Sequence, residues 1–523
     1  MEVRINLSVD LEDERALEEI TAARLKIDVK KIRGVKIIRK AVDARRYRGA
    51  GIKFNYIVDV DVAGKVNLRD GVVKVPATEK ITYHYSLTPN PYPLVIGFGP
   101  AGMFAALELA RAGLEPIIFE RGGDVDSRTA KVAKFFSTGE LDTDSNVQFG
   151  EGGAGTFSDG KLTTRIDDAL TDYVLKIFVE AGAPAEILYL QKPHIGTDKL
   201  RAVVKNIRQQ IIDLGGKIYF NAQVTDLENS AVIINNEQRF SADAIFFGIG
   251  HSARDTYEML NERGVAMEAK AFAVGLRIEH PQEFINIAQY GADFANPKLP
   301  VADYFLTYKG DGRGAYSFCM CPGGKVVAAT SEIGRVVTNG MSNFDRNSGV
   351  ANSALLVTVD KRDFGEGILS GIKFQRQLES AAFDLAGKNY FAPVQSVGDF
   401  LNGRADCTDF VVKPTYPIGY KVVDLNKILP LEVAKTLKDA LIFWNGKIKN
   451  FAAADVALTG VETRTSAPCR ILRDKMTRRS ISHSCIYPIG EGAGYAGGIM
   501  SSAVDGIKSA QAYIHTQIKG AHG

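Results

Sequence analysis

The chain has 523 residues, enough for about three domains of roughly 150 residues each. Its net charge of +3, with 45% hydrophobic and 24% charged residues, excludes a disordered chain and a globally basic nucleic-acid binder. Glycine is enriched, at 51 residues, and much of the excess falls in short clusters that we examine for function.

The five cysteines are odd in number and scattered, which argues against a secreted disulfide framework. The N-terminus is charged from residue 2 and so lacks a signal-peptide core. The apolar run from Pro91 to Leu107 contains three glycines and three prolines and is too short for a membrane span. The histidines show no metal-ligand spacing. We therefore expect a soluble, cytoplasmic protein with no membrane association and no metal.

Residues 1–88 predict a small, ferredoxin-like α+β domain, with strands near 4–9, 35–39 and 54–62 and a helix over 13–25. Within it, residues 24–53 hold 12 Lys or Arg and two Asp, a local charge of about +10. Two interpretations stay open. The long cationic side chains protect strand edges, or they bind an anionic partner such as RNA or an acidic face of the rest of the protein. The three prolines of residues 85–93 then indicate a stiff linker and a domain boundary.

After this linker the sequence predicts, in order, a strand, a glycine turn, a helix, a second strand and an acidic residue. The strand Leu94–Ile96 is followed by Gly97–Gly102, a helix over 103–112, a strand over 116–119, and Glu120. In this pattern Gly97 permits a tight turn, Gly99 lets a pyrophosphate approach the backbone, and Gly102 lets the helix pack closely on the sheet. The helix N-terminus offers free N–H groups to the phosphates. The unit therefore predicts a dinucleotide site.

Glu120 lies 18 residues beyond Gly102, where its carboxylate can accept hydrogen bonds from a ribose diol. A 2′-phosphate would be repelled there, which disfavours NADP and leaves FAD and NAD.

Three further glycine clusters bear on this choice. Residues 150–162 indicate a loop that runs past the cofactor rather than a second dinucleotide turn. Residues 244–253 form a strand and a glycine turn, which we interpret as the return strand of the same domain; the alternative is a second nucleotide site for NAD(P)H. Residues 486–500 precede a helix over about 501–515, whose N-terminus would stabilise negative charge on a reduced flavin.

A series of motifs, in this order along the chain, resembles the bacterial uncharacterised FAD-dependent dehydrogenases, which are flavoproteins of the glutathione-reductase-like superclass. The motifs are YPLVIGFGPAG with FER, GEGGAGTFSDGKL, HIGTDKL, GIGHSARD, FCMCPGG, GVETRTSAP and YPIGEGAGYAGGI. The resemblance spans about residue 30 to the end. It implies an α/β fold with a Rossmann-like FAD-binding domain assembled from residues 89–269 and 466–523. It also implies an inserted α+β substrate domain, residues 270–465, and the small N-terminal domain.

The resemblance also implies roles for single residues. Val224, in a strand expected over residues 217–224, would contact adenine through its backbone, and Glu491 would take the place of an Asp beside the ribityl chain. Residues 498–500 would lie at the pyrimidine edge of the flavin. The complete set of predicted cofactor-binding residues is Gly97, Gly99, Pro100, Ala101, Gly102, Glu120, Arg121, Gly152, Gly153, Gly155, Thr156, Ser158, Lys161, Val224, Gly250, Gly490, Glu491, Gly498, Ile499 and Met500.

A flavin carries hydride chemistry itself, so few obligatory side chains are expected. Cys319 and Cys321 alternate in a strand-like segment and are candidate redox thiols, although buried strand cysteines often only pack. Arg277 and Arg464 are candidates for clamping a substrate carboxylate, and His251 for a general acid. The sequence predicts an FAD-dependent oxidoreductase acting on a small organic molecule, with NAD(P)H as a possible transient donor. The alternatives are a flavin-containing RNA-associated protein and a non-catalytic FAD redox sensor.

Overall fold

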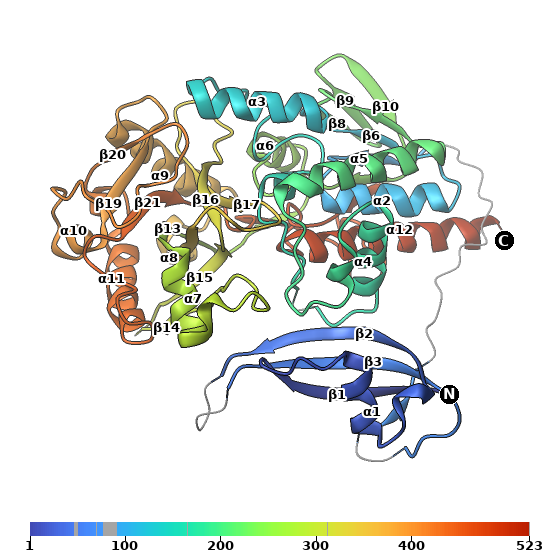
Figure 1. Ribbon diagram of the computed structural model, residues 1–523. Helices are drawn as coiled ribbons and strands as arrows, with labels where there is room; N and C mark the ends of the chain where they lie inside the picture. Colours follow the sequence, from blue (N-terminus) through green and yellow to red (C-terminus); the bar gives the residue numbers. More distant parts are fainter. Residues whose placement is uncertain (46–50, 69–70, 77–91, 165, 311, 522–523) are drawn as a thin grey trace.

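The computed structural model describes residues 1–45, 51–68, 71–76, 92–164, 166–310 and 312–521 (Figure 1). Residues 85–91 of the predicted linker lie outside them. Among the described residues, no helix is both long and apolar enough to cross a membrane.

The N-terminal domain is one antiparallel sheet with a helix. It consists of β1 (Glu2–Asp10), α1 (Leu17–Leu25), β2 (Ile32–Asp43), β3 (Lys53–Val62) and β4 (Val73–Lys74). The strand order β2-β3-β1-β4, with α1 as the crossover from β1 to β2, is the ferredoxin-like order. Every second residue of β1 is buried, as expected for a strand with one face on a core. The domain differs from the complete ferredoxin-like plan because residues 63–68 and 71–72 form no second helix between β3 and β4.

This domain is attached to the rest of the protein along the edge strand β2. The backbone N–H of Lys40 donates to the carbonyl of Tyr189 at 2.7 Å, and the N–H of Gln191 donates to the carbonyl of Lys40 at 2.9 Å. Leu11, Ile52 and Phe54 also join the hydrophobic core of the inserted domain. Part of the basic stretch 24–53 therefore belongs to an internal contact, and an anionic partner for the remainder stays a prediction.

The second body is a parallel sheet of short strands, which are apolar apart from the edge strand that begins at Lys217. Its members are β5 (Leu94–Ile96), β6 (Ile117–Phe119), β7 (Lys217–Tyr219), β11 (Ile245–Phe247) and β23 (Ile486–Pro488), in the order β23-β11-β5-β6-β7. All neighbours are parallel, which requires helical crossovers and burial of both faces. The helices α2 (Pro100–Arg111) and α12 (Ile499–Ala521) lie side by side on this sheet, although they are almost 400 positions apart in the sequence (Figure 1). The predicted return strand is confirmed as β11, which lies beside β5.

The strand expected over residues 217–224 is divided in two, so this expectation was wrong. The chain turns at Asn221, whose φ of +53° is incompatible with a continuous strand. Val224 thus begins β8 (Val224–Glu228), which pairs with β9 (Ala231–Ile234) and β10 (Gln238–Ser241) in a separate antiparallel sheet.

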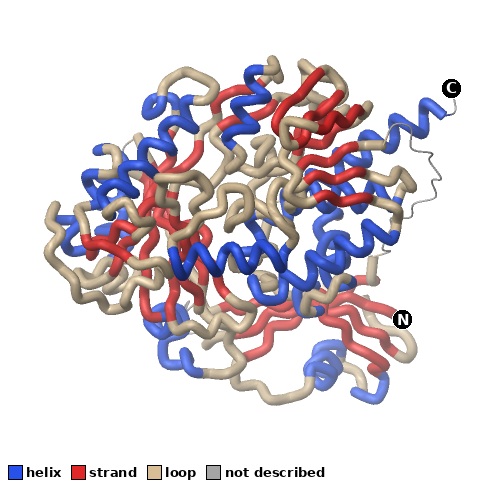
Figure 2. Tube along the Cα trace, turned by 90° about the horizontal axis from the view of Figure 1, so that it is seen from above, coloured by secondary structure: helices blue, strands red, loops and turns tan. Residues whose placement is uncertain are grey.

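The third body lies between two paired strands, β12 (Met267–Ala269) and β22 (Cys469–Ile471), through which the chain leaves the parallel-sheet body and returns. Its seven-stranded sheet has the order β14-β15-β18-β13-β21-β19-β20. Loops rather than helices or strands fill much of the region between the two large sheets (Figure 2). The strands are β13 (Phe272–Pro281), β14 (Thr307–Lys309), β15 (Gly314–Cys321), β18 (Val350–Val359), β19 (Ala392–Ser396), β20 (Tyr420–Val422) and β21 (Ala457–Glu462), with the hairpin β16 (Gly324–Ala328) and β17 (Thr338–Ser342).

The remaining helices cover these sheets. They are α3 (Val125–Thr138), α4 (Leu170–Glu180), α5 (Thr197–Asp213), α6 (Arg254–Glu262), α7 (Gln282–Tyr290), α8 (Lys361–Phe364), α9 (Ser370–Ala386), α10 (Val397–Asn402) and α11 (Leu431–Asn445).

The glycine-rich segment at 150–162 is a loop, as predicted, apart from one short 3-10 helix (Ala154–Phe157), and a buried arginine of α3 holds its first part in place. Arg128 is fully buried and donates to the carbonyls of Asn146, Val147, Gly150, Glu151 and Gly153 at distances of 2.7–3.2 Å. Burial lowers the pKa of its guanidinium to about 9. Backbone carbonyls of a buried loop need donors, and this side chain supplies them where no strand or helix does.

We expect Arg128→Met to destabilise the protein by at least ~3 kcal/mol, because five buried carbonyls lose a charge-assisted donor while the side-chain volume is nearly kept. The urea midpoint of the full chain measures this, and protease cleavage within residues 139–153 would report local opening. Arg15→Met, at an exposed arginine, is the control and should leave the midpoint unchanged. Equal midpoints for Arg128→Met and the unmodified protein would contradict this account of the loop.

Candidate functional site

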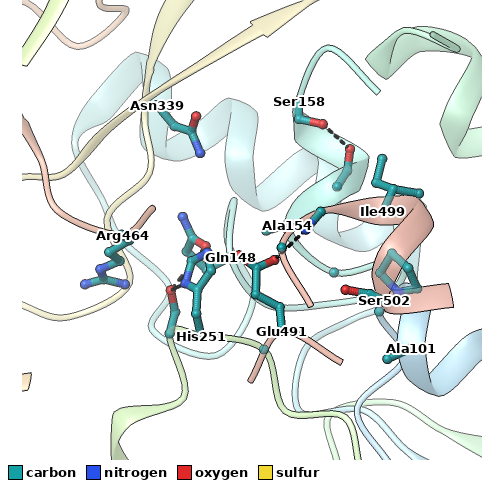
Figure 3. A pocket seen from close by; sticks show the side chains of 18 of the residues that line it. Ala101, Gln148, Ala154, Ser158, His251, Asn339, Arg464, Glu491, Ile499 and Ser502 are labelled. Atoms are coloured by element: carbon teal, nitrogen blue, oxygen red, sulfur yellow. Dashed lines mark hydrogen bonds between the residues drawn. The ribbon is translucent and has the colours of Figure 1, made fainter. Parts of the chain in front are cut away.

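A cavity of about 560 Å³ lies between the parallel sheet and the inserted domain. Its wall combines the turn after β5, the loop 148–163, the turn after β11, the end of β15 and the N-terminus of α12. Figure 3 shows side chains from both bodies around it: Ala101, Glu491, Ile499 and Ser502 from one side, and Asn339 and Arg464 from the other. A pocket of this size at the carboxyl ends of parallel strands is typical of a ligand site in an open α/β sheet.

The glycine turn after β5 is shaped by close backbone packing. Gly97 has a φ of +89°, and a Cβ there would lie 2.5 Å from the carbonyl oxygen of Gly248. A Cβ on Gly102 would lie 1.9 Å from the carbonyl oxygen of Gly97. Both positions therefore require glycine for the turn itself. At Gly99, by contrast, a Cβ would meet only Gly153, at 3.6 Å, so the protein alone does not require glycine there.

Gly99 is the N-cap of α2 and Pro100 is its first residue. Proline suits this position because the first N–H groups of a helix have no partner within the helix. Gly99, Pro100 and Ala101 all line the cavity, so the positive end of the α2 dipole faces it.

The Glu120 carboxylate lines the cavity, but backbone amides already hold it. Oε2 accepts from the N–H of Phe98 at 2.8 Å, and Oε1 accepts from the N–H groups of Gly122 and Gly150 at 3.0 and 2.9 Å. It thus ties the turn after β5 to the glycine-rich loop. Oε2 has one N–H partner and retains acceptor capacity for a ribose hydroxyl, and that role stays a prediction.

Most predicted cofactor-binding residues line the cavity. Those that do are Gly97, Gly99, Pro100, Ala101, Glu120, Arg121, Gly153, Gly155, Ser158, Lys161, Val224, Gly250, Glu491, Gly498, Ile499 and Met500. Gly102, Gly152, Thr156 and Gly490 lie behind this wall. Gly152 packs against the Thr156 hydroxyl, Thr156 bonds the Glu151 carbonyl, and Gly490 donates to Asp505. These four residues support the residues that line the cavity but do not line it themselves.

Glu491 stands at the entrance to α12, where Oε2 accepts from the N–H of Gly498 at 3.3 Å. The surrounding protein raises the pKa of this carboxyl to about 7, because desolvation outweighs the Gly498 N–H and the nearby Lys270 ammonium. Near neutral pH Glu491 is therefore divided between its neutral and charged forms. The first residues of α12, Ile499 to Ser502, line the same wall, so the N-terminus of this helix faces the cavity.

The two candidate arginines are both paired with carboxylates of the protein. Arg277 is fully buried behind the cavity wall and forms a two-bond pair with Glu462, at 2.6 and 2.9 Å. Arg464 lines the cavity but bonds Glu379 at 3.1 and 3.2 Å. A substrate carboxylate would have to compete with these partners.

Arg464 belongs to a buried charge cluster that the sequence reasoning missed. Arg254 of α6 pairs with Glu379 of α9 at 2.6 Å and with Glu332, while Arg376 bonds Glu332 at 2.7 Å. The cluster joins the parallel-sheet body to the inserted domain. The paired residues of this cluster are 44 to 125 positions apart in the sequence, and no local pattern signals their pairing.

His251 lines the cavity, and its Nδ1 lies 2.9 Å from the hydroxyl of Ser252, which in turn bonds Gln148. Burial and the guanidinium groups of Arg464 and Arg254 lower the pKa of His251 to about 3. At neutral pH it is therefore a neutral imidazole, with one ring N–H to donate.

The inserted domain adds a second region of the cavity that was not predicted. Phe305 and Phe318 line it with 59% and 40% exposure, and Lys192, Asn339 and Arg346 lie on the same wall. Arg346 pairs with buried Asp159 at 2.5 Å. In the part of the chain that the structure describes, no group of three or more His, Cys, Asp or Glu is arranged to hold a metal.

Two family models match the chain. "FAD-dependent protein, C-terminal domain-like" covers residues 271–465, and "Domain of unknown function (DUF8436)" covers residues 1–61. A Clostridium beijerinckii protein, described as an uncharacterized protein, is 49% identical over 97% of both chains.

The chain is also similar to solved structures, at much lower sequence identity. CtdE in complex with FAD is 13% identical over 82% of this chain and 88% of its own, with a TM-score of 0.33. Glycine oxidase from Geobacillus kaustophilus is 10% identical over 81% of this chain and 94% of its own, with a TM-score of 0.35. The family assignment depends on the matching model and on the Clostridium relative rather than on these structures. The chain belongs to one family with that Clostridium relative, and its residues 271–465 match the model of FAD-dependent proteins, which confirms the resemblance drawn from the sequence motifs.

Proposed function

We propose that this protein is an FAD-dependent oxidoreductase that binds FAD in the cavity and transfers hydride between the flavin and a small organic molecule. One observation carries the proposal: the dinucleotide turn, the N-terminus of α12 and a wall of the inserted domain border one continuous cavity. A dinucleotide bound at the turn would thus have its other end beside a region able to hold a second molecule.

The residues present fit FAD. The close-packed turn at Gly97 leaves the α2 N-terminus open toward the cavity, and a Cβ on Gly497 or Gly498 would meet nothing within 4 Å. We assign the pyrophosphate to the Gly99–Ala101 backbone and the adenosine ribose to Glu120. Val224, at the start of β8, lies on the same wall and would contact the adenine.

Bound flavin supplies the hydride acceptor or donor atom, N5. The chain's own contribution is orientation, charge and exclusion of water. The α12 N-terminus places a positive dipole end beside residues 498–500, where negative charge on a reduced ring would be stabilised. The Ser252 hydroxyl donates to Gln148, so its oxygen accepts the Nδ1–H of the neutral His251 ring. Nε2 of His251 can then accept a hydrogen bond without adding a full charge. The aromatic wall at Phe305 and Phe318 favours an organic substrate with an apolar part.

Gly99→Ala tests the assignment of the pyrophosphate. The extended backbone at Gly99, with a φ of −79°, accepts alanine, and its Cβ would make only an ordinary 3.6 Å contact. We expect unchanged folding and an FAD affinity lower by about tenfold, or ~1.4 kcal/mol, because a methyl group separates the phosphates from the backbone. Fluorescence titration of the apoprotein with FAD measures it. Gly34→Ala, at an open position of β2, is the control; equal affinity for both variants argues against phosphate binding at this turn.

The redox function is tested with the purified full chain. We expect a flavin absorbance spectrum, or uptake of added FAD, and bleaching of that spectrum when NADH, NADPH or a reducing metabolite is added without oxygen. A stopped-flow record gives the rate for each donor. A protein that takes up FAD but is reduced by none of these donors would favour the non-catalytic sensor, and a folded protein that takes up no FAD would refute the proposal.

A further inference from the structure

The end of β15 carries two cysteines at a distorted point of the strand. Phe318 pairs with Ala354 of β18 but Cys321 pairs with Asn352, so β15 contains one extra residue here, a β-bulge. Cys319, within this bulge, has a φ of +42°, in the left-handed region that non-glycine residues rarely adopt. Such strain persists only where the surrounding structure fixes it, and it concentrates at functional sites.

The two thiols differ in access. Cys319 is partly exposed and lines the cavity, as Lys161 and Glu491 also do. Cys321 is fully buried behind it and donates its S–H to the carbonyl oxygen of Cys319 at 3.3 Å. The Arg277 guanidinium donates to that same carbonyl at 3.3 Å. The Cys319 sulfur is therefore open to a molecule in the cavity, whereas the Cys321 sulfur is shielded from it and lies within hydrogen-bond reach of the Cys319 thiol.

The charges around the pair favour a thiolate on the exposed side. The Cys321 thiol, Lys161 and Arg277 lower the pKa of Cys319, in spite of partial desolvation of the thiol and the nearby Asp159 carboxylate. The same contact raises the pKa of Cys321, so the buried sulfur keeps its proton. The thiolate is the nucleophilic form of cysteine.

We propose that Cys319 and Cys321 form a reversible disulfide that exchanges with organic disulfides entering the cavity, with Cys319 as the attacking and Cys321 as the resolving thiol. The Cys319 thiolate attacks one sulfur of R–S–S–R, the S–S bond breaks, and one thiolate leaves. Cys321 then loses its proton and attacks Sγ of Cys319, which releases the second thiol. Two S–H bonds of the protein become one S–S bond, and the disulfide is reduced to two thiols.

The exchange needs only the organic disulfide. Its connection to flavin electrons rests on the proposed function, in which the same cavity holds FAD. The pair would then provide a second two-electron couple beside the cofactor and define organic disulfides and dithiols as a substrate class.

The probe is glutathione disulfide, added to the full chain both as purified and after saturation with FAD. We expect the intact mass to fall by two hydrogen atoms, and peptide mapping to locate the new bond between residues 319 and 321. Cys321→Ser should stop at the first step and retain one glutathione on Cys319. Cys319→Ser should carry no glutathione on Cys321, because the accessible thiolate is gone and the remaining thiol is buried and protonated.

Cys407→Ser is the matched control, since Cys407 is likewise partly exposed and bonds a backbone carbonyl. It should form the 319–321 bond at the unmodified rate. The proposal is overturned if both thiols stay reduced across glutathione ratios, or if glutathione on Cys319 is never displaced by Cys321. Absorbance of bound FAD is recorded on the same samples. Disulfide formation without FAD uptake would support the cysteine proposal and refute the proposed flavin function. FAD uptake without disulfide formation would support FAD binding and refute the cysteine proposal.

Discussion

The cavity depends on buried charges that bond to backbone rather than to each other. Loops form much of its wall, and a loop lacks the partners that a strand or helix gives its N–H and C=O groups. Arg128 donates to five carbonyls of the segment that includes Gly150. Glu120 accepts from three amides, those of Phe98 in the turn after β5, of Gly122, and of Gly150. One cation and one anion thus fix the glycine-rich loop against the turn after β5. Glycines make the close approach possible, and these two ions give it a single conformation.

A second set of buried charges joins the two large bodies. Arg254, Glu379 and Arg464 come from α6, α9 and the segment after β21, and all three are buried. Buried ion pairs seldom add much net stability, but removing one partner leaves an uncompensated charge. The cluster therefore favours one relative position of the inserted domain and the parallel sheet. The width of the cavity between the two bodies follows from that position.

Local sequence pattern predicted the parts of the fold that depend on local chemistry. The strand, glycine turn and helix from Leu94 to Arg111 follow from glycine spacing and apolar runs, and the return strand at 245–247 follows from the same logic. The division of residues 217–228 was missed because Asn221 adopts a left-handed conformation that the neighbouring residues do not predict. Arg128, Gln148 and Asn339 were missed because their roles depend on contacts between distant segments. For Arg277 and Arg464 the residue type suggested a free clamp, whereas long-range carboxylate partners, Glu462 and Glu379, were not visible in the sequence.

The pairing of β12 with β22 places the two ends of the inserted domain next to each other, with Ala269 opposite Cys469. Neighbouring ends mean that a unit can be added to or removed from a host chain without stretching the host, and tolerated domain insertions share this geometry. The parallel-sheet body therefore has the form of a host for the inserted segment. Under the proposed function, exchange of that segment would alter the substrate while leaving dinucleotide binding in place. The two bodies are not fully independent, because the carboxylates that neutralise Arg254 of the parallel-sheet body belong to the inserted domain.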